Sequence, residues 1–262
     1  MLRHYKGYFI DLDGTIYKGK ERIPAAKGFI ERLQAAHVPF LFLTNNTTKT
    51  PEAVVDNLAH NHGIHVSPET VYTPSLATAA YLTSRAQTVG HKFSFYCIGE
   101  LGLKKALLDA GMTLEEVNPD YVVVGLDYDV TYHKFETATL AIKRGARFIG
   151  TNEDTNLPNE RGLVPGAGSL VALVERATQQ KAFYIGKPQV PIMRAALNEI
   201  GLPPKDVIMV GDNYHTDIQA GINTGMDTLL VTTGYTKPTE VPKLPVKPTY
   251  VVASLADWQV EA

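Results

Sequence analysis

The segment YFIDLDGTI at residues 8–16 decides the fold, because an apolar, β-forming run leads directly into two aspartates. If the strand stops at Ile10, Asp11 lies at its carboxyl end, which is where open α/β sheets bind their ligands. Two carboxylates there can hold a divalent cation, and one of them can act as a nucleophile. The same residues also suit an ordinary Asx-type turn. Residues 8–16 alone therefore do not distinguish a catalytic site from an ordinary turn, and segments further along the chain are needed.

A second apolar run, VPFLFL at residues 38–43, ends in the hydroxyl and amide side chains of Thr44 and Asn45. Such groups can donate hydrogen bonds to phosphate oxygens without adding negative charge. Thr50 and Pro51 then fit the N-cap and the first position of a helix. This pattern also occurs in ordinary strand-to-helix loops, so it supports the first segment without proving it.

Two later segments repeat the pattern. FYIGKP at residues 183–188 places Lys187 after a short apolar strand, where an ammonium group can neutralise a bound anion. VIMVGDNYHTDI at residues 207–218 ends a strand at Asp212 and brings Asp217 to the start of a helix, where a carboxylate can also be a simple cap. Four strands in this order, each followed by residues suited to metal-assisted phosphoryl transfer, favour a catalytic site over four unrelated turns.

Four motifs carry a resemblance to a known family: Asp-Leu-Asp-Gly-Thr from residue 11, Thr-Asn-Asn from residue 44, Gly-Lys-Pro from residue 186 and Gly-Asp-Asn-Tyr-His-Thr-Asp from residue 211. In this order they resemble the motifs of the haloacid-dehalogenase (HAD) superfamily. Thr-Asn-Asn at residues 44–46 and Gly-Ala-Gly-Ser at residues 166–169 are similar to the NagD-like and p-nitrophenyl-phosphatase branch, subfamily IIA. The resemblance spans essentially the whole chain.

The resemblance implies an α/β fold with a Rossmann-like, mainly parallel sheet core and an inserted α/β cap domain of the C2 type. We expect the discontinuous core to comprise residues 1–78 and 182–262, and the cap to comprise residues 79–181. Strands and helical patterns alternate within this insertion, which carries enough apolar residues for its own small core. Its expected strands are residues 93–98, 121–125 and 147–150, and its expected helical face carries Tyr132, Phe135, Thr139 and Ile142.

The resemblance also implies a Mg²⁺-dependent phosphatase, a phosphoric monoester hydrolase acting on a small nucleotide or sugar phosphate. Asp11 would be the nucleophile that forms an aspartyl-phosphate. Asp13 would be the general acid for the leaving alcohol and then the general base for water. The expected phosphate-binding residues are Thr44, Asn45 and Lys187.

Mg²⁺ would be held by the Asp11 carboxylate, the Asp13 backbone carbonyl and Asp212. Asp217 and Asn213 are expected to orient these ligands from outside the coordination sphere. The eight histidines show no spacing typical of a zinc site.

Within the insertion, Asn152, Asp154 and Arg161 are the expected substrate contacts. Ser169 stands between a glycine-rich loop and an apolar segment, so we expect it to be the N-cap of a helix over residues 170–177. A glycine-rich loop at a helix N-terminus can also bind an anion, which is the alternative for this segment.

The amino-acid composition argues against several classes of protein. The 262 residues are 44% hydrophobic and 20% charged, with a formal net charge of −2, so nothing indicates nucleic-acid binding. No apolar run approaches the ~20 residues of a membrane span, and the N-terminus lacks an apolar signal-peptide core. The single cysteine, Cys97, lies in an apolar strand pattern. We expect a cytoplasmic protein with a small phosphorylated metabolite as its partner, and the resemblance is compatible with a homodimer.

Two other functions fit the same residues. A phosphotransferase or phosphomutase would pass the phosphoryl group from Asp11 to an alcohol instead of water. A catalytically silent metabolite-binding protein would need no nucleophile and general acid together. Turnover that is lost with EDTA would separate an enzyme from a binding protein.

Overall fold

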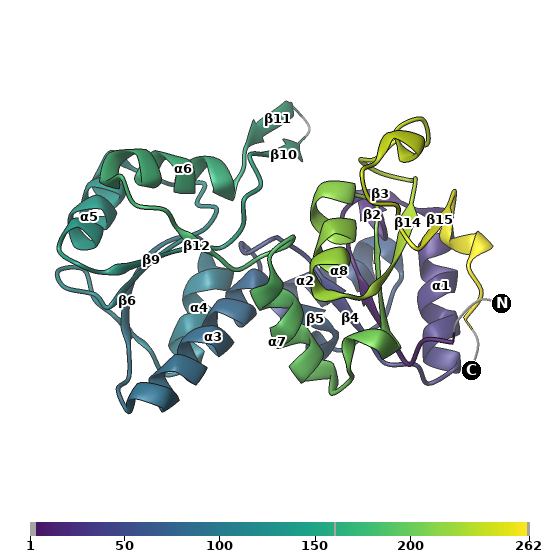
Figure 1. Cartoon of the computed structure of the whole chain (residues 1–262), viewed down its shortest axis with the longest axis horizontal. Coiled ribbons are helices and arrows are strands. Elements are labelled where there is room, and N and C mark those ends of the chain that lie inside the picture. Colours follow the sequence, from purple (N-terminus) through teal and green to yellow (C-terminus); the bar gives the residue numbers. More distant parts are fainter. Residues whose placement is uncertain (1–3, 160, 261–262) are drawn as a thin grey trace. The chain divides into compact units, whose positions relative to one another are not determined.

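The structure, a computed structural model of the chain, describes residues 4–159 and 161–260 (Figure 1). These residues form two compact units. The first contains the described residues within 1–44, 51–72 and 187–262, and the second contains residues 45–50 and those described within 73–186. Each unit has its own parallel sheet covered by helices, which confirms the α/β fold class.

The first unit is built on a six-stranded sheet in the order β15-β14-β13-β1-β4-β5, in which every neighbouring pair is parallel. Strands β1, β4 and β13 are buried at every position, as expected of strands covered on both faces. The strands are β1 (Gly7–Ile10), β4 (Phe40–Leu43), β5 (Val71–Tyr72), β13 (Val207–Gly211), β14 (Asp227–Val231) and β15 (Tyr250–Val252). Because they are parallel, the residues that follow β1, β4 and β13 all lie at one edge.

The helices of this unit follow the expected start and stop signals. α1 (Pro24–Ala35) and α7 (Val190–Ile200) begin with proline in their first turn, and α7 ends at Gly201 in the left-handed conformation. α2 (Pro51–Asn57) continues into a wide helical turn at Leu58–His62, and a similar turn at Tyr214–Ile218 precedes α8 (Gln219–Thr224). A short antiparallel hairpin joins β2 (Tyr17–Lys18) to β3 (Glu21–Arg22). Short 3₁₀ turns lie at Pro68–Thr70, Pro204–Asp206, Val241–Lys243 and Leu255–Asp257.

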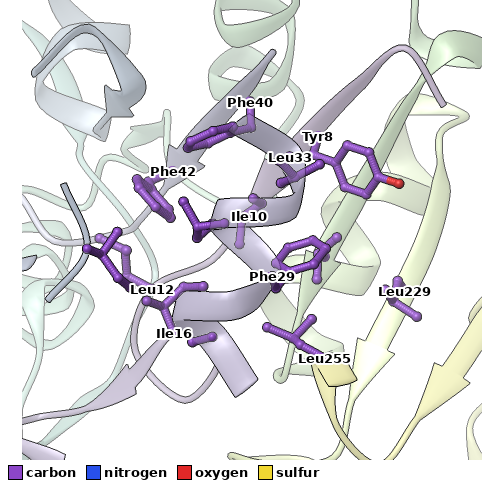
Figure 2. Packing of buried hydrophobic residues seen from close by; sticks show 14 of the residues in the cluster. Tyr8, Ile10, Leu12, Ile16, Phe29, Leu33, Phe40, Phe42, Leu229 and Leu255 are labelled. Carbon is purple, nitrogen blue, oxygen red and sulfur yellow. The ribbon is translucent and has the colours of Figure 1, made fainter. Parts of the chain in front are cut away.

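The core of the first unit lies between α1 and the sheet (Figure 2). Phe29 and Leu33 of α1 are fully buried, and the rings of Phe29 and Tyr8 meet edge to face at 5.9 Å. Arg32 of the same helix donates to the carbonyl oxygens of Leu255 and Trp258, at 2.9 and 3.2 Å. These bonds attach the last described segment to α1.

The second unit is built on a five-stranded parallel sheet in the order β12-β9-β8-β6-β7, with a separate hydrophobic core. Its strands are β6 (Ser94–Ile98), β7 (Thr113–Leu114), β8 (Tyr121–Val124), β9 (Arg147–Gly150) and β12 (Phe183–Tyr184), and its antiparallel hairpin is β10 (Asn156–Asn159) with β11 (Gly162–Pro165). The helices are α3 (Pro74–Val89), α4 (Leu101–Asp109), α5 (Tyr132–Lys143) and α6 (Ala167–Thr178). Cys97 is a buried thiol in β6.

The contact boundary between the units differs from the predicted domain boundary by a few residues. It falls at 72/73 and 186/187, whereas the sequence placed it at 78/79 and 181/182. α3 packs against α4, and β12 pairs with β9, so both elements belong to the second unit. The segment 45–50 also belongs there, which no local pattern in the sequence indicated. That the second unit acts as a cap stays a prediction.

One local prediction in the second unit is wrong, and another is confirmed. The N-cap of α6 is Gly166, and the hydroxyl of Ser169 lies within the first turn and donates to the carbonyl oxygen of Thr155 at 2.6 Å. The predicted helical face lies on α5: Phe135, Thr139 and Ile142 are at least partly buried, and Tyr132, the first residue of the helix, is exposed. Among the described residues, no helix is long and apolar enough to cross a membrane.

Leu33→Ala should lower the free energy of unfolding by about 2–5 kcal/mol, because it leaves a cavity where α1 packs on the sheet. Glu31→Ala on the same helix is the matched control: its partner is Lys27 at 3.6 Å and both side chains are exposed, so its effect should stay within about 0.5 kcal/mol. Urea unfolding can be followed by the fluorescence of Trp258, the single tryptophan, which is buried in the first unit. Equal unfolding midpoints for the two variants would contradict the packing described.

Candidate active site

Asp11 stands at the carboxyl end of β1, where it meets a buried lysine. Its backbone N–H donates to the carbonyl oxygen of Val210 at 2.9 Å, which continues the pairing of β1 with β13. The ammonium of Lys187 donates to Asp11 Oδ1 at 2.7 Å and to Asp217 Oδ1 at 2.6 Å. Only 1% of Lys187 is exposed, so this cation is removed from water and held by two carboxylates.

Asp212 follows the neighbouring strand β13, and its carboxylate is in close contact with the backbone of two turns. Its carboxylate accepts hydrogen bonds from the Thr15 hydroxyl, at 3.2 Å, and from the backbone N–H of Tyr235. Gly14 and Gly234 approach the same carboxylate so closely that a Cβ at either position would collide with it. Gly14 also has a φ of +93°, which favours glycine. The position of Asp212 is therefore set by two turns from different parts of the chain.

Asp217 lies in the wide turn that follows Asp212 and is almost fully buried. Its Oδ2 accepts the backbone N–H of Asn213 at 3.1 Å, while its Oδ1 accepts Lys187 and, at 3.3 Å, the Thr216 hydroxyl. The Asn213 side chain caps the same turn by accepting the backbone N–H of His215 at 3.0 Å. Both residues thus stabilise the loop that carries Asp212.

Asp13 differs from these buried acids because its side chain is exposed. It lies in the turn after β1, where its Oδ1 accepts the backbone N–H of Gly19 at 3.4 Å. Partial burial nevertheless raises the pKa of the Asp13 carboxyl, against the opposing effect of that N–H. Burial and the nearby charges of Asp13 and Asp11 also raise the pKa of Tyr17, whose hydroxyl stays neutral.

The candidate site holds more buried carboxylates than buried ammonium groups. Carboxylate oxygens of Asp11, Asp212 and Asp217 lie within 4.8 Å of one another, against the single ammonium of Lys187. Burial and Asp217 raise the pKa of Asp11, although Lys187 opposes them, and burial and Asp217 raise the pKa of Asp212 to about 6. Burial alone would lower the pKa of Lys187, but the two bonded carboxylates raise it above its usual value. Three carboxylates and one ammonium leave an excess of two negative charges, which fits a divalent cation with oxygen ligands.

The remaining predicted residues fall into two groups. Thr44, buried at the end of β4, belongs to the first unit with Asp11 and Lys187. Asn45, Asn152 and Asp154 belong to the second unit and are hydrogen-bonded to one another. Arg161 is exposed in the turn between β10 and β11, where its backbone N–H donates to Asn159 Oδ1 at 2.8 Å.

The segment TTGYT at residues 232–236 also contributes to the site, although it was not among the predicted site residues. It follows the apolar strand β14 and supplies the Tyr235 N–H and the close approach of Gly234 to Asp212. The hydroxyl of Thr236 accepts the backbone N–H of Tyr214 at 2.9 Å. A strand that ends in hydroxyl residues and a glycine is the same signal that identified Thr44, so the segment could have been found.

The chain belongs to the haloacid dehalogenase-like hydrolase family, in the NagD-like branch of its phosphatases. The haloacid dehalogenase-like hydrolase model matches residues 8–113, and the HAD-hydrolase-like model matches residues 184–258. The 5'-nucleotidase YutF of Bacillus subtilis is 46% identical over 98% of each chain, and an acid sugar phosphatase of Staphylococcus epidermidis is 44% identical over 95% of each.

Solved structures agree with this placement. A mutant of the thermostable p-nitrophenylphosphatase of Bacillus stearothermophilus aligns with a TM-score of 0.88 at 48% identity, over 99% of this chain and all of that one. NagD of Escherichia coli K-12 aligns with a TM-score of 0.91 at 32% identity, over the same shares. The resemblance inferred from the four motifs is therefore confirmed over the whole chain, including the inserted unit.

Without a divalent cation, the protein should lose stability as the pH rises. The pKa values of Asp11 and Asp212 are higher in the folded state than in the unfolded state, so the folded state binds more protons above about pH 4. Their stabilising effect at low pH is lost as the pH rises through the folded pKa, which is about 6 for Asp212. Urea unfolding in EDTA between pH 4.5 and 7.5 should therefore show a steeper loss for the wild type than for Asp212→Asn.

Adding Mg²⁺ at pH 7.5 should stabilise the wild type more than Asp212→Asn, because the cation offsets the carboxylate repulsion. Parallel pH profiles for the two proteins, with the same response to Mg²⁺, would show that Asp212 is not part of a strained acidic cluster.

Proposed function

We propose that the chain is a Mg²⁺-dependent phosphatase that hydrolyses small phosphomonoesters through an aspartyl-phosphate on Asp11. The observation that carries this proposal is the buried contact of Lys187 with Asp11 at the end of β1, next to Asp212 at the end of β13. It supplies one nucleophile, one cation for a phosphate dianion and a carboxylate for a metal at one edge of the sheet. Membership of a phosphatase branch supports the same activity.

Asp11 is the proposed nucleophile. Lys187 holds one of its oxygens, which fixes the carboxylate plane and directs the second oxygen. Attack of that oxygen on phosphorus forms an acyl-phosphate bond and breaks the bond to the leaving alkoxide. Burial favours protonation of Asp11, so a nearby cation is needed to keep the carboxylate ionised and reactive.

Asp13 is the proposed general acid and base. Its raised pKa increases the fraction of the protonated form, which can give a proton to the leaving alkoxide. The carboxylate that remains can then take a proton from the water that attacks the aspartyl-phosphate. Its exposed side chain differs from the buried Asp11, as expected of a group that exchanges protons with an incoming water.

The Asp11 carboxylate, the Asp13 backbone carbonyl and Asp212 are the proposed ligands of Mg²⁺. When bound, this ion would neutralise the excess charge of the carboxylates and polarise the phosphoryl group. The contacts of Asp217 and Asn213 stabilise the loop of Asp212, which supports their assignment as orienting residues. Thr44, Asn45 and Lys187 are proposed to bind the phosphoryl oxygens.

The relatives narrow the class of substrate. Their names include a 5'-nucleotidase, an acid sugar phosphatase and a p-nitrophenylphosphatase, so we propose nucleotide or sugar phosphates as substrates and p-nitrophenyl phosphate as an assay compound. The second unit is the proposed cap, with Arg161 and its hairpin as a proposed substrate contact. A cytoplasmic location and a homodimer stay predictions.

Phosphate release from p-nitrophenyl phosphate, a nucleoside monophosphate and a sugar phosphate tests the activity. Turnover should be lost in EDTA and restored by Mg²⁺, and Asp11→Asn should abolish it because an amide cannot form the acyl-phosphate. Binding of inorganic phosphate with Mg²⁺ should survive in Asp11→Asn. Turnover in EDTA or in this variant would exclude the proposed mechanism, and phosphoryl transfer to added alcohols without release would favour the phosphotransferase alternative.

Asp13→Ala should slow enzyme phosphorylation by about 10²–10⁴-fold for an alkyl phosphate, and far less for p-nitrophenyl phosphate. The reason is that p-nitrophenolate leaves without a proton, whereas an alkoxide needs one. Dephosphorylation should slow equally for both substrates, because the aspartyl-phosphate and its water are then the same. Rapid mixing with p-nitrophenyl phosphate should thus give a burst of phenolate before slow turnover. An equal loss in the phosphorylation step for both substrates would show that Asp13 is not the general acid.

A further inference from the structure

The Asn45 side chain is enclosed by three groups of the second unit. Its Nδ2 donates to both carboxylate oxygens of Asp154, at 3.2 and 3.1 Å. Its backbone carbonyl oxygen accepts Asn152 Nδ2 at 2.9 Å. Gly186 passes so close to Asn45 Oδ1 that a Cβ there would lie 2.8 Å from that oxygen. The amide nitrogen of Asn45 is therefore held by Asp154, and its Oδ1 lies against the backbone of Gly186.

Asp154 is itself held rigidly. Its backbone N–H donates to Asn152 Oδ1 at 3.0 Å, and its carbonyl oxygen accepts the N–H of Gly168 at 2.9 Å in the first turn of α6. The backbone of Gly166 and Gly168 runs against residues 153 and 154 so tightly that neither position has room for a Cβ. Asp154 thus lies in the loop between β9 and β10, and these contacts attach that loop to the first turn of α6.

We infer that Asp154 is a positioning residue for phosphate binding, and not the substrate contact that the sequence suggested. The hydrogen bonds from Nδ2 to this carboxylate restrain the plane of the Asn45 carboxamide, and because the amide group is planar they set the direction of its N–H bonds. This inference rests on the proposed function, in which Asn45 binds a phosphoryl oxygen.

The negative charge of Asp154 does not itself favour a phosphate dianion, so orientation has to be its contribution. An aspartate can hold the Asn45 nitrogen with two equivalent acceptor oxygens, and asparagine retains one acceptor. Alanine retains none. The three residues at position 154 therefore form a series that separates hydrogen bonding from charge.

The two roles of Asp154 predict different patterns across substrates. A positioning residue acts on the phosphoryl group, which all phosphomonoesters share, so its loss should affect every substrate equally. A residue that contacts the leaving-group portion should change the preference between a nucleotide and a sugar phosphate. Inorganic phosphate, which has no leaving group, should respond only in the first case.

The test compares Asp154→Ala, Asp154→Asn and the control Asp109→Asn, an exposed carboxylate of α4 paired with Lys105. We expect Asp154→Ala to lower kcat/KM about 10-fold or more for p-nitrophenyl, nucleoside and sugar phosphates alike, since a hydrogen bond to a charged group is lost. The inhibition constant of inorganic phosphate in the presence of Mg²⁺ should rise by a similar factor. Asp154→Asn should recover most of this loss, and Asp109→Asn should match the wild type.

A substrate-dependent loss, or an unchanged inhibition constant for phosphate, would overturn the inference. Partial unfolding of a variant would lower kcat because it reduces the fraction of active protein. It would leave the inhibition constant of phosphate unchanged, and that result would count against the inference. Calorimetric titration with inorganic phosphate and Mg²⁺ keeps the test independent of turnover. A wild type that binds phosphate but releases none from any ester would refute the proposed function, while the effect of Asp154→Ala on phosphate affinity would still decide the inference.

Discussion

The site in the first unit depends on one buried cation between two carboxylates. Lys187 bonds Asp11 and Asp217, residues far apart in the sequence, and removing its charge would leave both acids buried without a counterion. Buried ion pairs often stabilise a fold no better than apolar residues of similar volume would, so stability alone gives little reason for this arrangement. Burying these charges costs free energy. The function proposed for these residues explains the cost, because a phosphate dianion and a metal ion would have to bind at the same place.

The positions of these carboxylates depend on close contacts with the backbone as well as on the neighbouring charges. Asp212 is in contact with the backbone at Gly14 and Gly234, and Asp217 is in contact with Gly211 in the same way. A side chain at any of these positions would displace a carboxylate of the acidic cluster. Backbone N–H donors, from Tyr235 to Asp212 and from Asn213 to Asp217, then fix the carboxylates that Lys187 alone could not orient. The glycines and the acids are therefore parts of one constraint.

The sequence predicted the parts of the structure that depend on local patterns. Apolar runs that end in polar residues identified β1, β4 and β13, and the parallel topology brings their ends together at one edge of the sheet. Two features depend on contacts between distant segments and were missed: the membership of residues 45–50 in the second unit and the contact of Tyr235 with Asp212. The helix start at Ala167 was also misplaced, because Gly166 and Ser169 are both acceptable caps by propensity.

The boundary between the two units falls between Thr44 and Asn45, and this limits how the substrate specificity of the chain can change. These neighbours are both proposed to bind phosphate, yet the first belongs with the β1 sheet and the second is bonded to Asp154 of the inserted unit. An insertion that selected only the leaving group could be exchanged without effect on phosphate binding. Here the insertion also holds Asn45, which is proposed to bind phosphate, through two hydrogen bonds. Replacement of the whole insertion would therefore have to preserve a carboxylate or amide acceptor at position 154 before any new substrate preference could be expressed.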